Sequence, residues 1–144
     1  MDPLKNLLPF EREKIAKAPA LLAYLSAMKD GYVEPQEKEI AERVTFFSKY
    51  SSDPLMKDYF ELASKNFDKY YDEIFKYMAA KEYKEKLINE QLEEIRKLIE
   101  EKTDKEFQYA WNESMKEFVN ILNHEKRNPI EYFLLPLNIP GVTD

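Results

Sequence analysis

The chain has 144 residues, a length that fits one domain with a sizeable hydrophobic core. Hydrophobic residues make up 44% of it and charged residues 35%, which excludes an intrinsically disordered class. The net charge of -6 argues against nucleic acid as the main ligand, because phosphate binding relies on clustered Lys and Arg. Because there is no cysteine, disulfides, thiolate metal sites and thiol nucleophiles are excluded.

The chain contains only two glycines, Gly31 and Gly141, and this scarcity disfavours β-hairpins and phosphate-binding loops. We therefore expect an all-α fold, a compact bundle of about six helices that forms a single domain over residues 1–144. No apolar run approaches the roughly 20 residues that a membrane span needs, so we expect no membrane span. The N-terminus lacks the pattern of a signal peptide, which makes a cytoplasmic protein the expectation.

The first half of the chain carries clear helix signals. Pro9 is placed to open a first helix through residues 11–16. The next helix has the i, i+3, i+4, i+7 apolar spacing, with Leu21, Leu22, Leu25 and Met28 on one face. It ends at Asp30-Gly31, where glycine can adopt the left-handed conformation. A third helix opens at Glu34-Pro35, and its core stripe is Ile40, Val44 and Phe47.

Helical spacing continues in the second half. Asp53 is a good N-cap before Pro54, and the pattern then runs to Met78 with a possible break near Lys65-Asn66. The charged stretch 81–102 has a narrow apolar stripe of Ile88, Leu92, Ile95 and Ile99. It also has the favourable i, i+4 pairs Glu82/Lys86 and Glu93/Lys97, which indicate a solvated helix with one buried seam. It lacks the clean heptads of a coiled coil.

The last predicted helix is capped by Thr103 or Asp104. Beyond it, Pro136 and Pro140 prevent residues 130–144 from forming a long helix or a central strand. We expect this segment to be an irregular strap across the bundle, with a sticky arm for a partner as the alternative.

The sequence offers no catalytic set. His124 is the only histidine, and the residue three before it is Ile121, so the Glu-x-x-His pattern of di-iron bundles is missing. Zincin, nucleophile-elbow, P-loop and Rossmann patterns are absent as well. We therefore expect no enzymatic activity.

Tyrosines gather in one region of the chain and are candidates for a partner-binding face: Tyr59, Tyr70, Tyr71 and Tyr77. Tyrosine is enriched at protein interfaces, which supports this interpretation. The alternative is that these rings belong to the core and its rim, with their hydroxyls reaching solvent.

Acidic side chains gather at the predicted elbow between the second and third helices. Asp30, Glu34 and Glu37 are candidates for a divalent-cation site, because oxygen ligands suit Ca²⁺ or Mg²⁺. Gly31 and Pro35 would set the geometry of the elbow. In the alternative interpretation, the carboxylates accept hydrogen bonds from free amides at the start of the third helix and lock the corner.

The stretch from Ala20 to Glu37 reads Ala-Leu-Leu-x-x-Leu-x-x-Met-x-Asp-Gly-x-Val-x-Pro-x-Glu. It resembles the helix–elbow–helix signature of TerB-like domains, a family that includes the tellurite-resistance protein TerB and the N-terminal region of DjlA-type co-chaperones. The resemblance implies a compact all-α fold, divalent-metal association through Asp30, Gly31 and Glu37, and a stress-related role without catalysis. Lys29 departs from the family pattern, since a small residue usually precedes the Asp, and a nearby lysine weakens cation binding.

Two functions follow as expectations. The first is a non-enzymatic TerB-like module with a stress-response or protein-interaction role, which binds a divalent cation at the elbow. The second is a purely structural helical protein that self-associates or binds a protein partner through the tyrosines or the strap.

Overall fold

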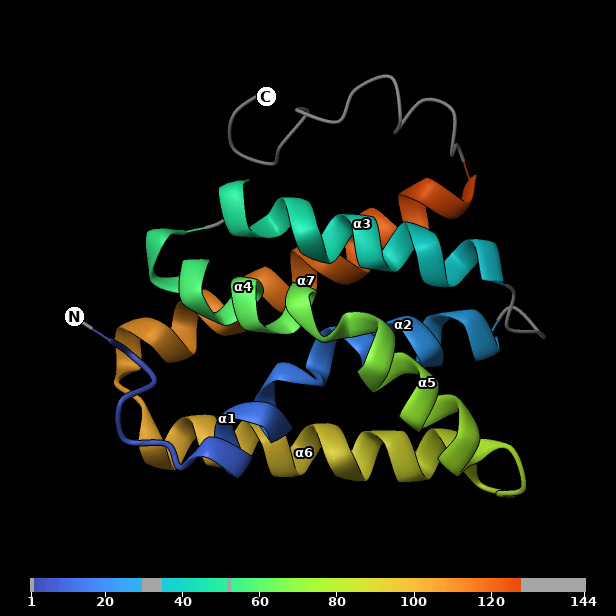
Figure 1. Ribbon diagram of the computed structural model, residues 1–144, viewed down its shortest axis with the longest axis horizontal. Helices are drawn as coiled ribbons and strands as arrows, with labels where there is room; N and C mark the ends of the chain where they lie inside the picture. The colour runs from blue at the N-terminus through green and yellow to red at the C-terminus, as the bar shows by residue number, and fades with distance from the viewer. Residues whose placement is uncertain (1, 30–34, 52, 128–144) are drawn as a thin grey trace.

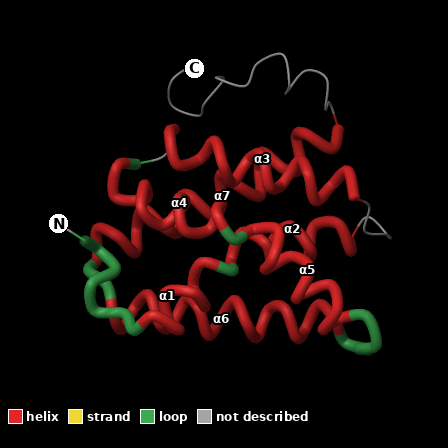
Figure 2. Tube along the Cα trace, viewed as in Figure 1, coloured by secondary structure: helices red, strands yellow, loops and turns green. Residues whose placement is uncertain are grey.

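The computed structural model describes residues 2–29, 35–51 and 53–127. Within these ranges the chain forms seven α-helices and one short 3-10 helix and contains no strand, which confirms the all-α prediction. The elements are α1 (Pro9–Ala16), α2 (Ala18–Lys29), α3 (Pro35–Ser51), η1 (Pro54–Met56), α4 (Lys57–Lys65), α5 (Phe67–Met78), α6 (Lys84–Lys102) and α7 (Lys105–Arg127). The helices stack closely, and the described connections, drawn in green in Figure 2, are short (Figures 1 and 2). The predicted strap, residues 130–144, lies outside the described residues.

Helix α2 lies at the centre of the bundle, in contact with α1, α3, α5, α6 and α7. Its residues are buried on nearly all sides, among them Ala20, Leu21, Ala23, Tyr24 and Ala27. A helix that is apolar all round is typical of a protein interior. The small alanine side chains allow the neighbouring helices to approach closely.

Proline explains how α1 passes into α2. Pro19 has no N–H, so it cannot donate to the carbonyl of Ile15 four residues earlier. The hydroxyl of Tyr59, on α4, donates to that carbonyl oxygen instead, at 2.6 Å. The two residues are 44 positions apart and both are fully buried, so this bond fastens α4 to the α1–α2 junction.

Carboxylate caps mark two of the predicted helix starts. The Asp53 side chain accepts a hydrogen bond of 2.9 Å from the backbone N–H of Leu55, and η1 begins at Pro54. The Asp104 side chain accepts one of 2.9 Å from the N–H of Phe107, at the start of α7. Each cap satisfies a backbone donor that has no partner within the helix.

The buried apolar side chains form one connected core, to which all seven α-helices contribute. Helix α6 runs along the lower edge of the molecule in Figure 1, where it contacts α1, α2 and α7. It buries Ile88, Ile95 and Ile99 and covers Leu92 only in part, close to the predicted seam. Among the described helices, none is both long enough and apolar enough to span a membrane.

Candidate functional site

The predicted cation site falls largely where the structure gives no description. Asp30, Gly31 and Glu34 lie outside the described residues, and the side chain of Glu37 is not described either. Helix α3 begins at Pro35. Within the described part of the chain, no group of three or more acidic, histidine or cysteine side chains is arranged to hold a metal ion. The elbow site stays a prediction.

Three of the four candidate partner-binding tyrosines are core residues. Tyr59 is 0% exposed, and Tyr70 and Tyr71 are buried with it, so none of the three presents a surface to a partner in this structure. Desolvation raises the pKa of Tyr59, although the nearby indole N–H of Trp111 opposes this rise. Burial likewise raises the pKa of Tyr70 to about 12, and the negative charges of Glu13 and Glu73 add to the effect.

Tyr71 belongs to the packing between α3 and α5. Its ring stacks on Phe67, with 5.9 Å between the centroids, and the ammonium of Lys38 lies 5.9 Å from its centroid. Lys38 also forms ion pairs with Asp68 and, at 2.9 Å, with Asp72 on α5. In both ion pairs the Lys38 ammonium donates a hydrogen bond to the carboxylate. The bond to Asp68 is the largest cause that raises the pKa of Lys38, and the bond to Asp72 adds to it. The cluster is therefore a contact between helices.

Tyr77 is the remaining candidate, and it is 53% exposed at the end of α5. The ammonium of Lys81 lies 4.8 Å from the centre of its ring, a cation–π contact. Lys81 in turn lines a large open hollow on the surface. Tyr77 thus stands beside a surface feature that the sequence did not indicate.

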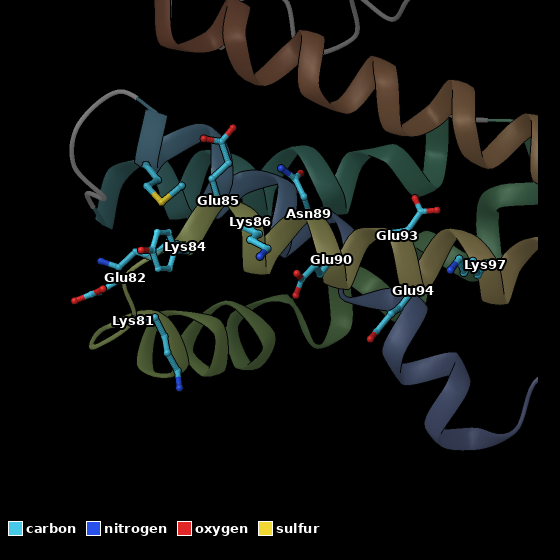
Figure 3. A pocket seen from close by; sticks show the side chains of 12 residues that line it. Lys81, Glu82, Lys84, Glu85, Lys86, Asn89, Glu90, Glu93, Glu94 and Lys97 are labelled. Carbon is cyan, nitrogen blue, oxygen red and sulfur yellow. The ribbon is translucent and has the colours of Figure 1, made fainter.

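This hollow, which we call the α6 groove, has a volume of about 1080 Å³ and is open to solvent. It begins at the turn between α5 and α6, follows α6 and includes Met28 near the end of α2 (Figure 3). Four lysines and five glutamates line it: Lys81, Lys84, Lys86, Lys97, Glu82, Glu85, Glu90, Glu93 and Glu94. Tyr83, which precedes α6 and is 75% exposed, also lines the groove.

Ion pairs occupy only part of the groove. Glu93 forms an ion pair with Arg96 on the next turn. The hydrogen bond that Arg96 donates in this pair is the main cause of the lowered pKa of Glu93. Glu94 forms an ion pair with Lys14 of α1 at 2.8 Å. Lys86 and Lys97 form no ion pair with any described residue. The groove therefore offers charged groups of both signs to a ligand.

A second hollow, of about 530 Å³, lies between the N-terminal arm, α1, α4 and α5. Its charged groups largely pair with one another or with a neighbour. Arg12 forms an ion pair with Asp2 at 3.4 Å, and Glu13 forms one with Lys69 at 3.5 Å. These contacts hold the arm and α5 against α1, which is a structural role.

Sequence reasoning missed the α6 groove because it treated residues 81–102 as a solvated helix with one buried seam. The available signal was the side of the helix opposite the isoleucines, where Lys86, Asn89, Glu93 and Lys97 recur with helical spacing. Tyr83, an aromatic residue just before the helical part of this charged stretch, was a further signal.

Comparison of the chain with protein-family models, with curated proteins and with solved structures gives no match. The TerB-like resemblance rests on the sequence between Ala20 and Glu37 alone, and it stays a prediction.

Proposed function

We propose that this protein is a non-enzymatic, TerB-like helical interaction module of the cytoplasm, and that it binds a protein partner along the α6 groove. The observation that supports this proposal is the position of the groove. It extends from the α5–α6 turn along α6 and includes Met28, two residues before Asp30 of the elbow. One residue of the surface we assign to the partner, Met28, thus belongs to the segment that carries the family resemblance.

The aromatic residues at one end of the groove support a protein rather than a small molecule as the ligand. Tyr83 is exposed and lines the groove, while Tyr77 contacts the groove residue Lys81. Tyrosine is enriched at the energetic centres of interfaces, because its ring buries much apolar area and its hydroxyl can still form a hydrogen bond. The lysines and glutamates around them would supply the polar rim of such an interface.

The test is affinity capture with the wild-type protein and with Tyr83→Ala, followed by measurement of Kd with the purified partner. We expect Tyr83→Ala to weaken binding by about ten-fold or more, as the loss of an interface anchor does. Tyr109→Ala is the matched control, because Tyr109 is 69% exposed but lies on α7, outside the groove. Equal affinity for the three proteins would refute the proposal.

The cation at the elbow is part of the same proposal. Ca²⁺ or Mg²⁺ bound by Asp30, Glu34 and Glu37 would stabilise the folded protein, because a ligand that binds only the folded state raises its stability. We expect the melting temperature to rise with one of these ions relative to EDTA, and this rise to vanish in Asp30→Asn and Glu37→Gln. If the wild-type protein shows no rise, the carboxylates instead lock the corner between the helices.

The alternative function is a structural protein that self-associates or captures a partner through residues 130–144. Deletion of the residues after Pro129 distinguishes it from the groove proposal. Under the alternative, this deletion abolishes binding and Tyr83→Ala does not; under the groove proposal the two results are reversed.

A further inference from the structure

The side of α6 that faces solvent carries an ordered set of charges. Within the helix, Lys86, Asn89, Glu93 and Lys97 follow one another at intervals of three or four residues, and all four are exposed. With 3.6 residues per turn, this spacing places them in one row. Glu82 precedes α6, in the turn that leads into the helix, and lines the same groove. We call these five residues the α6 stripe.

The α6 stripe lies on the side of the helix away from the core. The buried side contains Ile88, Ile95 and Ile99, which point into the bundle. Figure 3 shows Asn89 and Glu93 projecting from successive turns of α6. A second helix can therefore approach the stripe without displacing any part of the core.

When two copies of α6 lie antiparallel, the charges of one α6 stripe face opposite charges of the other. From Glu82 to Lys97 the signs run minus, plus, neutral, minus, plus. If a second α6 lies antiparallel, with a two-fold axis between positions 89 and 90, the turn that carries Glu82 lies beside Lys97 of the second copy. In the same register Lys86 faces Glu93, whose carboxylate also pairs with Arg96 of its own helix. Each pair occurs twice because of the symmetry.

We propose that the partner that occupies the α6 groove is a second copy of this chain, with the two α6 helices antiparallel about a two-fold axis beside Asn89. This inference rests on the proposed function, whose partner it identifies. It requires one self-complementary patch on each copy, which is the arrangement of a two-fold symmetric dimer.

Neighbouring residues fit the same register. Lys86 and Lys97 are both exposed, so their ammonium groups are accessible to the second copy. Glu90 faces the Asn89 amide, a hydrogen-bond donor, across the axis.

The proposed interface consists mainly of exposed ion pairs, so the affinity between the two copies is low. Such pairs are individually weak and are screened by salt over a Debye length of about 8 Å at physiological ionic strength. The dimer is therefore a concentration-dependent one that high salt dissociates.

Charge reversal tests the proposal directly. The acidic variant Lys86→Glu/Lys97→Glu has four negative charges in its stripe, and the basic variant Glu82→Lys/Glu93→Lys has four positive ones. We expect each variant alone to be monomeric in analytical ultracentrifugation, because like charges face each other. An equimolar mixture should form a heterodimer at least as tight as the wild-type dimer. Circular dichroism checks that both variants remain folded.

The cysteine-free chain permits a test of the register. Asn89→Cys places the two sulfurs beside the axis, so oxidation should yield a disulfide-linked dimer within the distance a disulfide allows. Glu101→Cys is the control, because the register separates its two copies by about 35 Å along the axis. Cross-linking of both variants to the same extent would overturn the inference.

The outcomes separate this inference from the proposed function. A wild-type protein that stays monomeric in low salt at every concentration overturns the second-copy assignment. If capture of another protein still depends on Tyr83 in that case, the interaction-module proposal stands. Self-association that is unchanged in both charge-reversal variants also overturns the inference.

Discussion

Helices α2 and α6 contact each other, yet their surfaces meet different surroundings. Helix α2 is enclosed by five other helices, and most of its side chains are buried. Helix α6 buries a narrow isoleucine row and exposes charged groups over the remainder. Because of this difference in burial, α2 contributes mainly to the stability of the bundle. Helix α6 instead has an exposed face whose residues can change without unfolding the protein.

The largest effect is expected from truncation of the central helix. Leu21→Ala should lower the free energy of unfolding by about 2–5 kcal/mol, because it removes a buried side chain and leaves a cavity. Leu92→Ala on α6 is the matched change, and it should cost less because Leu92 is only partly buried. Urea denaturation of the two variants measures both values, and an equal loss would contradict the contrast between the helices.

Loss of the Tyr59 hydroxyl should have the next largest effect. Tyr59→Phe leaves the buried carbonyl of Ile15 without its side-chain donor, which should lower the free energy of unfolding by about 1–3 kcal/mol. Chemical denaturation against the wild-type protein measures this loss. If Tyr59→Phe is as stable as wild type, water or the backbone must satisfy that carbonyl.

Alkaline pH should weaken the same core. In the folded protein, burial raises the pKa of Tyr70 from its ordinary value of 10.0 to about 12. Because the folded state holds this proton more tightly than the unfolded state, its contribution to stability is complete below pH 10 and is lost as pH rises toward 12. Urea denaturation across this range should show a steeper decline for the wild-type protein than for Tyr70→Phe. Parallel declines would exclude Tyr70 as a cause.

The smallest effect on stability is expected on the outer face of α6. Lys86→Ala should change the free energy of unfolding by less than about 0.5 kcal/mol, because Lys86 is exposed and makes no ion pair with a described residue. The same variant should weaken self-association. A large loss of stability would mean that Lys86 serves the fold, and the contrast between α2 and α6 would then fail at this position.

Local signals in the sequence were sufficient for several elements. Pro9 opens α1, Asp53 caps the turn before Pro54, and the break between α4 and α5 falls beside Asn66. Such signals depend on backbone groups a few residues away, so they can be recognised without knowledge of the tertiary structure. The sequence also indicated the α6 seam, because the 3.6-residue repeat brings its isoleucines to one side.

The tertiary structure alone decided which tyrosines are core residues. Tyr59 and Tyr77 belong to the same tyrosine-rich stretch, yet the first is bonded to Ile15, 44 residues away, and the second is exposed beside Lys81. Aromatic rings suit both cores and interfaces, so composition could not distinguish the two.

By itself, the sequence determined the helical class, most helix starts and the two-sided character of α6, because these follow from spacing and from caps within a few residues. Only the tertiary structure decided that α2 is enclosed and that Tyr59 donates to the Ile15 carbonyl, for which Pro19 cannot supply the usual helical donor. It likewise formed the groove that extends from the α5–α6 turn along α6 and includes Met28. These features depend on which distant segments meet, and that is set by packing of the whole core.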